Sequence, residues 1–323
     1  MIAALAGLLA AATAAAAGEA PTVLATGQTG VMKVVVDGRD IYWAAEGGIF
    51  RAPRDGGPAR RFSDKTAADL AIDGTAIYAP AETQLWKFPR DGSAPVKLVA
   101  TDEAITSVVV DGVHVYFGQR GTAASLRRVA KGGGSPEKLA EIPKAGVGHI
   151  VLDGTHAYFT LLRWTGEGGA IMRIAKARGA KLETVYDGER VAGGFAADAT
   201  HVYFTLEGTR EKEHRDGKLL RVLKGGMTLK PAARPEIISS GLFSPWDLAL
   251  DGGFVYVAEQ GSILKRSDLG SVTRVAIAGG SRETVAARQG GPYSLALEGG
   301  RVYWAAFTDG AIRSLPLLAT RQR

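Results

Sequence analysis

The sequence contains neither cysteine nor asparagine among its 323 residues. The lack of cysteine excludes disulfide bonds, thiol catalysis, cysteine-ligated zinc and a lipid anchor on cysteine. The lack of asparagine excludes N-glycosylation, which uses that residue as its acceptor. The folded chain must therefore be stabilised by packing alone, without covalent cross-links.

Long hydrophobic runs are also scarce, and the one uncharged stretch at the start is residues 1–17. We interpret it as a secretory signal peptide with a small-residue cleavage site around Ala15 to Ala17, because it is too short and alanine-rich to span a membrane. The alternative is a disordered or helical N-terminal extension, since no lysine or arginine stands at its front. The sequence thus predicts a periplasmic or secreted protein with no membrane span.

In place of these features the chain carries a repeat. An apolar run, an Asp-Gly-like turn and a short segment containing tyrosine recur from Val34 to Trp43 onward. Successive tyrosines lie about 36 to 53 residues apart, within the range of propeller-type arrays. No linker interrupts the pattern, so we predict one domain over residues 18–323. The recurring tyrosines are Tyr42, Tyr78, Tyr116, Tyr158, Tyr203, Tyr256 and Tyr303.

Each repeat predicts four strands. The first is a continuous apolar run, which is typical of a strand covered on both faces. The tyrosine segment follows, then a segment with an apolar and a basic residue such as Ile49 and Arg51, then a short segment such as Val96 to Val99. This arrangement predicts a seven-bladed β-propeller with four-stranded antiparallel blades. The repeated Asp of the first turn and the repeated Arg or Lys are expected to form structural hydrogen bonds.

The two ends of the chain predict how the ring closes. The last repeat leaves little room for a fourth strand after Ile312, and Ala20 to Thr26 matches the fourth-strand segment Ala94 to Thr101. We therefore expect the N-terminal strand to join the last blade, which would pair an edge that is otherwise open. We predict a monomer.

Positive charge exceeds negative charge, with 39 Lys and Arg against 33 Asp and Glu and a pI of about 9.4. The basic residues are spread along the repeats instead of clustering, which indicates a solvated basic surface. We expect no nucleic-acid partner.

The units DGRDIYW and IFRAPRDGG, and LEGGRVYW with IRSLP, resemble repeats of YWTD-type, NHL-type and TolB-like bacterial propellers over about Val23 to Leu318. The resemblance implies an extracytoplasmic binding or scaffold propeller, with a minority of enzymes in the wider set. YWTD propellers usually have six blades and a full Tyr-Trp-Thr-Asp, whereas here Thr-Asp is missing and the repeats predict seven blades. Function must still be argued from the site.

The first strand of each blade lines the central channel of a propeller, so polar residues in these strands mark a candidate site. One matched position reads Lys33, Asp69, Ser107, His149, Gly194, Asp247 and Ser294. We predict a charged ligand or ion at the channel mouth, held by Lys33, Asp69, His149 and Asp247. Trp246 and Tyr293 stand next to two of these positions and could stack on a sugar or pack between blades. The alternative is a water-filled entrance whose polar residues pair with one another.

The connections after the second strands predict a partner site. They are expected to be long at Thr160 to Ala170, Thr205 to Lys218 and Glu259 to Ser271. Long loops on neighbouring blades suit a protein partner, and the alternative is a solvated hairpin tip. The candidate partner residues are Arg163, Trp164, Arg210, His214 and Arg215.

The chain lacks a nucleophile elbow, a phosphate loop and an HExxH helix, so we favour a non-catalytic binding protein without a cofactor. The alternative is a metal-dependent lyase, lactonase or hydrolase. Its metal, for example Ca²⁺, would lie at the channel mouth on Asp69, His149 and Asp247 with Glu46 or Glu259. Calcium-dependent propeller enzymes commonly also use asparagine, and this chain has none.

Overall fold

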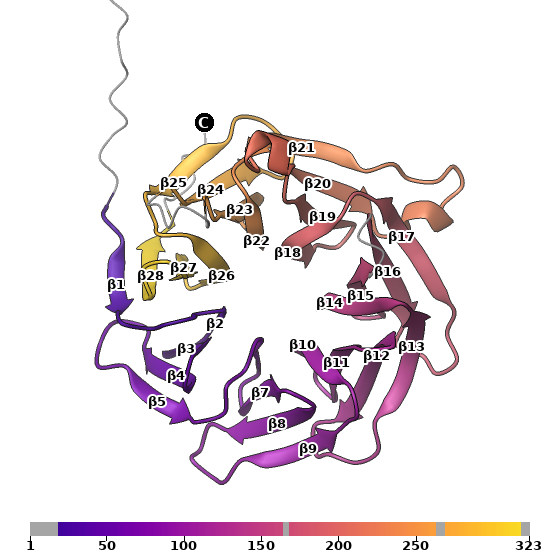
Figure 1. Ribbon diagram of the computed structural model, residues 1–323, viewed down its shortest axis with the longest axis horizontal. Coiled ribbons are helices and arrows are strands. Elements are labelled where there is room, and N and C mark those ends of the chain that lie inside the picture. Colours follow the sequence, from indigo (N-terminus) through magenta and orange to yellow (C-terminus); the bar gives the residue numbers. More distant parts are fainter. Residues whose placement is uncertain (1–18, 164–167, 263–268, 318–323) are drawn as a thin grey trace, which may run out of the picture.

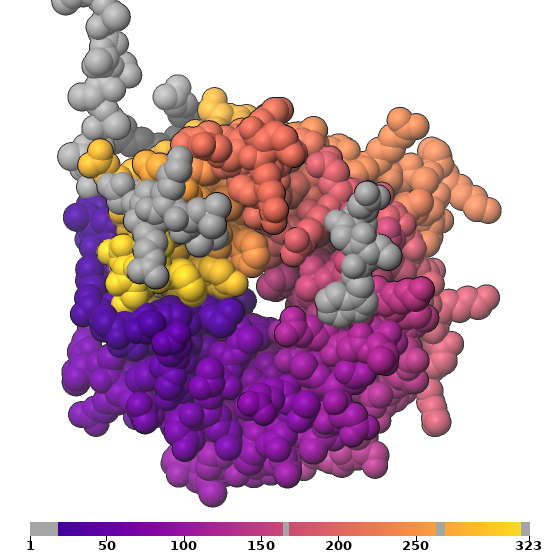
Figure 2. All heavy atoms as spheres, in the orientation of Figure 1, coloured from indigo at the N-terminus to yellow at the C-terminus, as the bar shows by residue number. Residues whose placement is uncertain are grey.

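The computed structural model describes residues 19–163, 168–262 and 269–317. These residues contain 28 strands and two short 3-10 helices, η1 (Arg210–Lys212) and η2 (Gly226–Thr228). The predicted all-β class is confirmed. The sheets surround a central opening, which stays visible when all atoms are drawn (Figures 1 and 2). No helix in the described part of the chain is long and apolar enough to cross a membrane.

The sheets are antiparallel and mostly four-stranded, as predicted. Their orders are β2-β3-β4-β5, β6-β7-β8-β9, β18-β19-β20-β21, β22-β23-β24-β25 and β26-β27-β28-β1. One eight-stranded sheet contains β10 to β17, and it is joined by the pairing of Arg120 in β11 with Gly146 in β14. A single residue pair makes this junction a local contact between two four-stranded units.

The strand bounds follow the four predicted segments of each repeat. The first strands are β2 (Lys33–Asp37), β6 (Ala71–Ile72), β10 (Ala104–Val110), β14 (Ala145–Leu152), β18 (Val191–Ala197), β22 (Pro245–Asp251) and β26 (Pro292–Glu298). The tyrosine strands are β3 (Asp40–Ala45), β7 (Ala76–Ala81), β11 (His114–Arg120), β15 (His156–Arg163), β19 (His201–Leu206), β23 (Phe254–Glu259) and β27 (Arg301–Ala306).

The two outer strands of each unit carry the basic and the short segments. The third strands are β4 (Gly48–Pro53), β8 (Gln84–Pro89), β12 (Ala123–Ala130), β16 (Gly169–Ala175), β20 (Gly217–Leu223), β24 (Ser271–Ala276) and β28 (Ala311–Pro316). The fourth strands are β5 (Arg60–Ser63), β9 (Val96–Ala100), β13 (Glu137–Pro143), β17 (Leu182–Gly188), β21 (Glu236–Leu242) and β25 (Glu283–Ala287).

The N-terminal strand β1 (Thr22–Ala25) lies beside the end of the chain. It pairs antiparallel with β28, with Thr22 opposite Ser314 and Val23 opposite Arg313. Leu24 and Ala25 of this strand are buried with Ile312 and Trp43 in one apolar cluster. The first and last parts of the sequence are therefore held together by strand pairing and by packing.

The hydrophobic core lies between neighbouring sheets. Tyr78 and Leu85 of one sheet pack with Val108 and Phe117 of the next, and Tyr203 packs in the same way across the seam between the β18–β21 and β22–β25 sheets. Every recurring tyrosine is at most 3% exposed. A side chain of this size removes enough apolar surface from water to contribute about 2 to 3 kcal/mol, so the tyrosines stabilise the seams between sheets.

Candidate functional site

Irregularities in the first strands place the polar side chains of the channel. The pairing register shifts between Ile105 and Ser107 in β10, between Pro245 and Asp247 in β22, and between Pro292 and Ser294 in β26. A bulge leaves the extra residue unpaired and re-aims the side chains beside it. The extra residues are Thr106, Trp246 and Tyr293. A similar shift in β14 contains His149.

These residues come together at one end of the channel, in a cavity of about 170 Å³ that we call the mouth cavity. Its walls come from strands or strand ends of six different sheets. Six of the eight predicted channel residues line it: Lys33, Asp69, His149, Trp246, Asp247 and Tyr293. Met32, Thr106, Ser294 and two small residues complete the wall. The structure therefore assembles most of the predicted set.

Asp69 and Asp247 have a structural role at this mouth. Each carboxylate accepts a backbone N–H from the residue that follows it, and a second from the next sheet. The second bonds are Val108 N–H to Asp69 and Leu295 N–H to Asp247, both 2.9 Å. The Ser294 hydroxyl accepts the N–H of Val34 at 3.2 Å in the same way. At Asp69, Asp247 and Ser294, the matched position of the first strands therefore links neighbouring sheets through a hydrogen bond. The sequence alone did not reveal this role.

Lys33 and His149 respond differently to the enclosed site. Burial alone would lower the Lys33 pKa, but the charges of Asp247 and Asp69 outweigh it and raise the pKa above its usual value. Burial and the Lys33 charge lower the pKa of His149, against the opposing effect of the two carboxylates. At about pH 7 the mouth cavity therefore holds an ammonium, two aspartates that accept backbone hydrogen bonds, and a neutral imidazole.

Two aromatic residues, Trp246 and Tyr293, line the mouth cavity, and Phe307 packs beside Tyr293 outside its lining. The rings of Trp246 and Tyr293 are 5.3 Å apart at 37°, and those of Tyr293 and Phe307 are 5.5 Å apart at 31°. Phe307 is 39% exposed. Burial raises the pKa of Tyr293, with a smaller contribution from Asp247, so its hydroxyl is neutral at about pH 7. We call Trp246, Tyr293 and Phe307 the aromatic ledge.

Glu46 and Glu259 lie outside the lining of the mouth cavity. Glu46 is exposed and lies against Gly30. Glu259 is 3% exposed and accepts the Phe243 N–H and the Thr273 hydroxyl, each at 2.7 Å. Its position at the end of β23 therefore gives it a structural role. Neither residue therefore joins the other six predicted channel residues in the mouth cavity.

The described residues contain no group of three or more His, Asp and Glu side chains arranged to hold a metal ion. Asp69, His149 and Asp247 share a cavity but do not form such a group.

A larger cavity of about 930 Å³ lies beside the mouth cavity, and we call it the side cavity. Trp246 lines both cavities. The side cavity is also lined by Glu189, Arg190, Glu207, Arg210 and His214. The connections predicted at Thr205 to Lys218 and Glu259 to Ser271 thus border it, although residues 263–268 of the second lie outside the described chain.

The predicted partner residues are only partly brought together. Arg210 and His214 line the side cavity, and the His214 ring nitrogen lies 3.5 Å from Glu207. Arg215 lies over the Phe243 ring at 4.1 Å. The predicted loop at Thr160 is wrong, because β15 continues to Arg163, which pairs with Asp187 at 2.9 Å. Trp164 falls outside the described residues.

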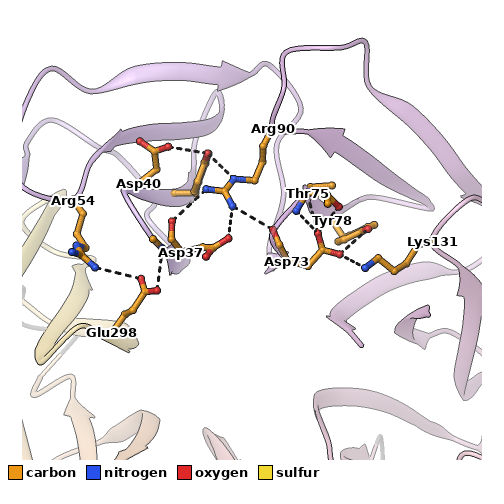
Figure 3. Close-up of polar contacts among 12 residues, drawn as sticks. Asp37, Asp40, Arg54, Asp73, Thr75, Tyr78, Arg90, Lys131 and Glu298 are labelled. Carbon is orange, nitrogen blue, oxygen red and sulfur yellow. Dashed lines mark hydrogen bonds and ion pairs between the residues drawn. The ribbon is translucent and has the colours of Figure 1, made fainter. Parts of the chain in front are cut away.

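The other end of the first strands carries ion pairs between sheets, which we call turn clasps (Figure 3). An acidic residue at the first turn of one four-stranded unit meets a basic residue just after the third strand of a neighbouring unit. Lys176 pairs with Asp111 at 3.0 Å and Lys224 with Asp153 at 2.8 Å. The remaining clasps are Arg90 with Asp37, Lys131 with Asp73, and Arg54 with Glu298.

The clasp aspartates also organise their own turns. Asp153 accepts the N–H groups of Thr155 and His156 and the Tyr158 hydroxyl, at 2.8 to 3.0 Å. Burial alone would raise the pKa of Asp153, but Lys224 and these donors outweigh it and hold the pKa well below its usual range. The predicted structural role of the repeated Asp is confirmed.

Comparisons with known proteins identify the fold and nothing more specific. No family model matches the sequence, and no curated protein matches it. YCF48 from Cyanidioschyzon merolae is 11% identical, with a TM-score of 0.67, over 93% of this chain and 99% of its own. The RRP9 WD40 repeats are 11% identical, with a TM-score of 0.65, over 92% and 97%.

A chain of the nidogen/laminin complex is 18% identical to this one, with a TM-score of 0.55, over 80% of this chain and 97% of that chain. These similar structures are β-propeller repeat proteins, and the expected resemblance to propeller repeats is confirmed. Identities this low show the fold alone, so function must come from the two cavities.

Proposed function

We propose that this protein is an exported, non-catalytic β-propeller that binds a ligand or protein partner through the face formed by the mouth and side cavities. One observation carries the proposal. Six predicted side chains from five sheets line one small cavity, and its tryptophan also lines the larger cavity beside it. Binding sites favour concave places where loops and polar groups from several elements converge. The nidogen/laminin neighbour was solved in a complex of two proteins.

The binding test compares a variant of this face with a variant of the opposite end. Trp246→Ala with Arg210→Ala alters both cavities, whereas Val113→Ala changes a 64% exposed residue at the β10–β11 turn. After crosslinking in the producing cells, mass spectrometry quantifies what each variant retains. We expect the face variant to lose bound ligand or partner by about tenfold or more, the cost of removing central contacts, and Val113→Ala to lose none. Equal retention by both variants would contradict the proposal.

The propeller is proposed to have seven blades, closed by β1, and to act as a monomer. The 28 strands and the pairing of β1 with β28 support this arrangement. A chain beginning at Gly30 lacks β1, whereas one beginning at Gly18 keeps it. We expect the shorter chain to unfold at a clearly lower temperature because it exposes the edge of β28 and part of the Trp43 cluster. Equal melting temperatures would contradict closure by β1.

Export rests on the amino acids of residues 1–17, which lie outside the described residues. Cleavage after Ala17 would leave Gly18 as the first residue of the mature chain. N-terminal sequencing of the protein recovered from the periplasm or medium tests this directly. Recovery of the uncleaved chain in the cytoplasm would contradict export.

A further inference from the structure

The Lys33 ammonium in the mouth cavity has no direct protein partner. Within the described residues its Nζ forms no hydrogen bond, and no carboxylate lies within 4.0 Å of it, although Asp69 and Asp247 act on it electrostatically. Both aspartates instead accept backbone N–H groups. A half-buried ammonium keeps three hydrogen-bond donors, so these donors are available to an acceptor that enters the cavity.

The rest of the mouth cavity suits a polyhydroxylated ligand. Each oxygen of Asp69 and Asp247 accepts one N–H and retains a further acceptor site. The His149 ring lines the same wall and forms no hydrogen bond with any described side chain or backbone group. Hydroxyl groups can donate to these carboxylates and bond to the imidazole. A ligand without hydroxyls would displace water from these groups and leave the remaining acceptor sites of the carboxylates and the imidazole unfilled, which is costly.

The aromatic ledge supplies a surface for a ring. Trp246 and Tyr293 are both only partly buried, so part of each aromatic surface is accessible. Tryptophan and tyrosine present large apolar faces beside a polar group, which suits the C–H face of a sugar. Because Trp246 also lines the side cavity, a ligand lying on it can extend toward Arg190 and Arg210. Neither arginine side chain has a hydrogen-bond or ion-pair partner among the described residues.

We propose that the mouth cavity binds a sugar acid, with the carboxylate on Lys33, the hydroxyls on the Asp and His side chains, and the ring on Trp246. This inference rests on the proposed binding function and specifies its ligand. A second acidic sugar unit would reach the arginines of the side cavity, so a short oligouronate fits better than a monomer. The two aspartates disfavour a densely charged anion such as a phosphate ester, because they repel added negative charge.

Calorimetric titration tests the ligand class with three probes: digalacturonate, a neutral galactose disaccharide and benzoate. We expect digalacturonate to bind about tenfold or more tightly than the neutral disaccharide, since it adds a charge-assisted hydrogen bond. Benzoate carries the charge but not the hydroxyls, so we expect it to bind more weakly still. Equal binding of the acidic and neutral sugars, or tighter binding of benzoate, would overturn the sugar-acid assignment.

Substitutions at Lys33 test whether its ammonium makes the mouth cavity prefer an acidic sugar over a neutral one. Lys33→Gln removes the charge at similar length and should weaken digalacturonate binding about tenfold while leaving the neutral disaccharide nearly unchanged. Lys33→Arg should retain most of the preference. Lys97→Gln, at an exposed lysine of the outer strand β9, is the matched control and should bind as the unaltered protein does. An unchanged preference in Lys33→Gln would overturn the role of Lys33.

Substitution of the tryptophan tests the ledge. Trp246→Ala should weaken both sugars about tenfold or more, because it removes the ring surface that both would use. Trp86→Ala removes a half-buried tryptophan from β8 in a different sheet and should leave both affinities unchanged.

A failure of digalacturonate to bind at millimolar concentration would overturn the inference. The proposed binding function would still stand if the face variant loses its bound partner in the crosslinking test.

Discussion

The two ends of the first strands differ in how they use charge. At the turn end, acidic and basic side chains recur in register and pair across the seams between sheets. At the mouth end, bulges interrupt the register, Lys33 has no direct partner within the described parts of the chain, and the residues differ from sheet to sheet. Repeated, paired charges indicate a structural role, whereas a half-buried charge without a protein partner indicates a place for a ligand.

A second contrast exists within the turn end itself. The seams on either side of the β22–β25 sheet have no turn clasp among the described residues, because Ile277 and Leu317 stand where the other sheets have a base. Both apolar residues pack against the neighbouring core instead. Among the described residues, the sheet that carries Trp246 and Asp247 is therefore joined at this end without ion pairs, by apolar contacts and by a hydrogen bond from the Arg221 guanidinium to the Ile277 carbonyl at 2.7 Å.

The largest expected effect comes from removing a clasp aspartate. Asp153→Ala deletes bonds to Thr155, His156 and Tyr158 and leaves Lys224 without its carboxylate. We expect a loss of about 2 to 4 kcal/mol in the free energy of unfolding, measured in urea. Asp251→Ala is the matched control, since Asp251 is exposed at the equivalent turn without a clasp, and it should cost less than about 0.5 kcal/mol. Similar losses of stability in Asp153→Ala and Asp251→Ala would contradict the difference between seams with a turn clasp and seams without one.

Acid should weaken the turn end. The pKa values of Asp73, Asp111 and Asp153 lie well below their usual range, and that of Asp198 is about 2. A carboxylate whose pKa is lower in the folded chain stabilises the fold above its unfolded pKa, and this stability is lost as pH falls through the folded pKa.

We therefore expect the free energy of unfolding, measured in urea, to fall progressively between about pH 4 and pH 2, by on the order of 1 kcal/mol per clasp carboxylate, and the urea midpoint to fall with it. Asp153→Asn should show a smaller drop over this range, because it has one such carboxylate fewer. A midpoint that stays constant down to about pH 2 would contradict the role assigned to these aspartates.

Installing a missing clasp tests the contrast between seams in the opposite direction. Ile277→Lys places a base where Asp198 lacks one, at the cost of some apolar packing. Net stability should change little, but a double-mutant cycle with Asp198→Asn should give a favourable coupling of about 1 kcal/mol. A coupling of zero would show that position 277 does not face the acidic turn as the clasp positions do.

The smallest effect is expected at the mouth end. Lys33→Gln removes a charge that makes no hydrogen bond or close ion pair with the described residues, so stability should change by less than about 0.5 kcal/mol. Urea unfolding of this variant, alongside Asp153→Ala, compares the two ends directly. A loss comparable to that of Asp153→Ala would mean that Lys33 is structural.

Local sequence determined the fold class because each repeat carries its own strand and turn pattern. Apolar runs ending in Asp-Gly and the buried tyrosines specify strands that can bury their faces only against a neighbouring copy. The match of Ala20 to Thr26 with later fourth-strand segments likewise indicated that β1 would lie beside a third strand. These features depend on residues close together in the chain.

Tertiary structure decided the site. The position of Lys33, Asp69, His149 and Asp247 at one mouth could be predicted because they share one register position. Three features could not: the bulges that expose Trp246 and Tyr293, the backbone bonds that occupy both aspartates, and the burial of Glu259. Each depends on how separate sheets meet in space, and the side chains involved are far apart in sequence.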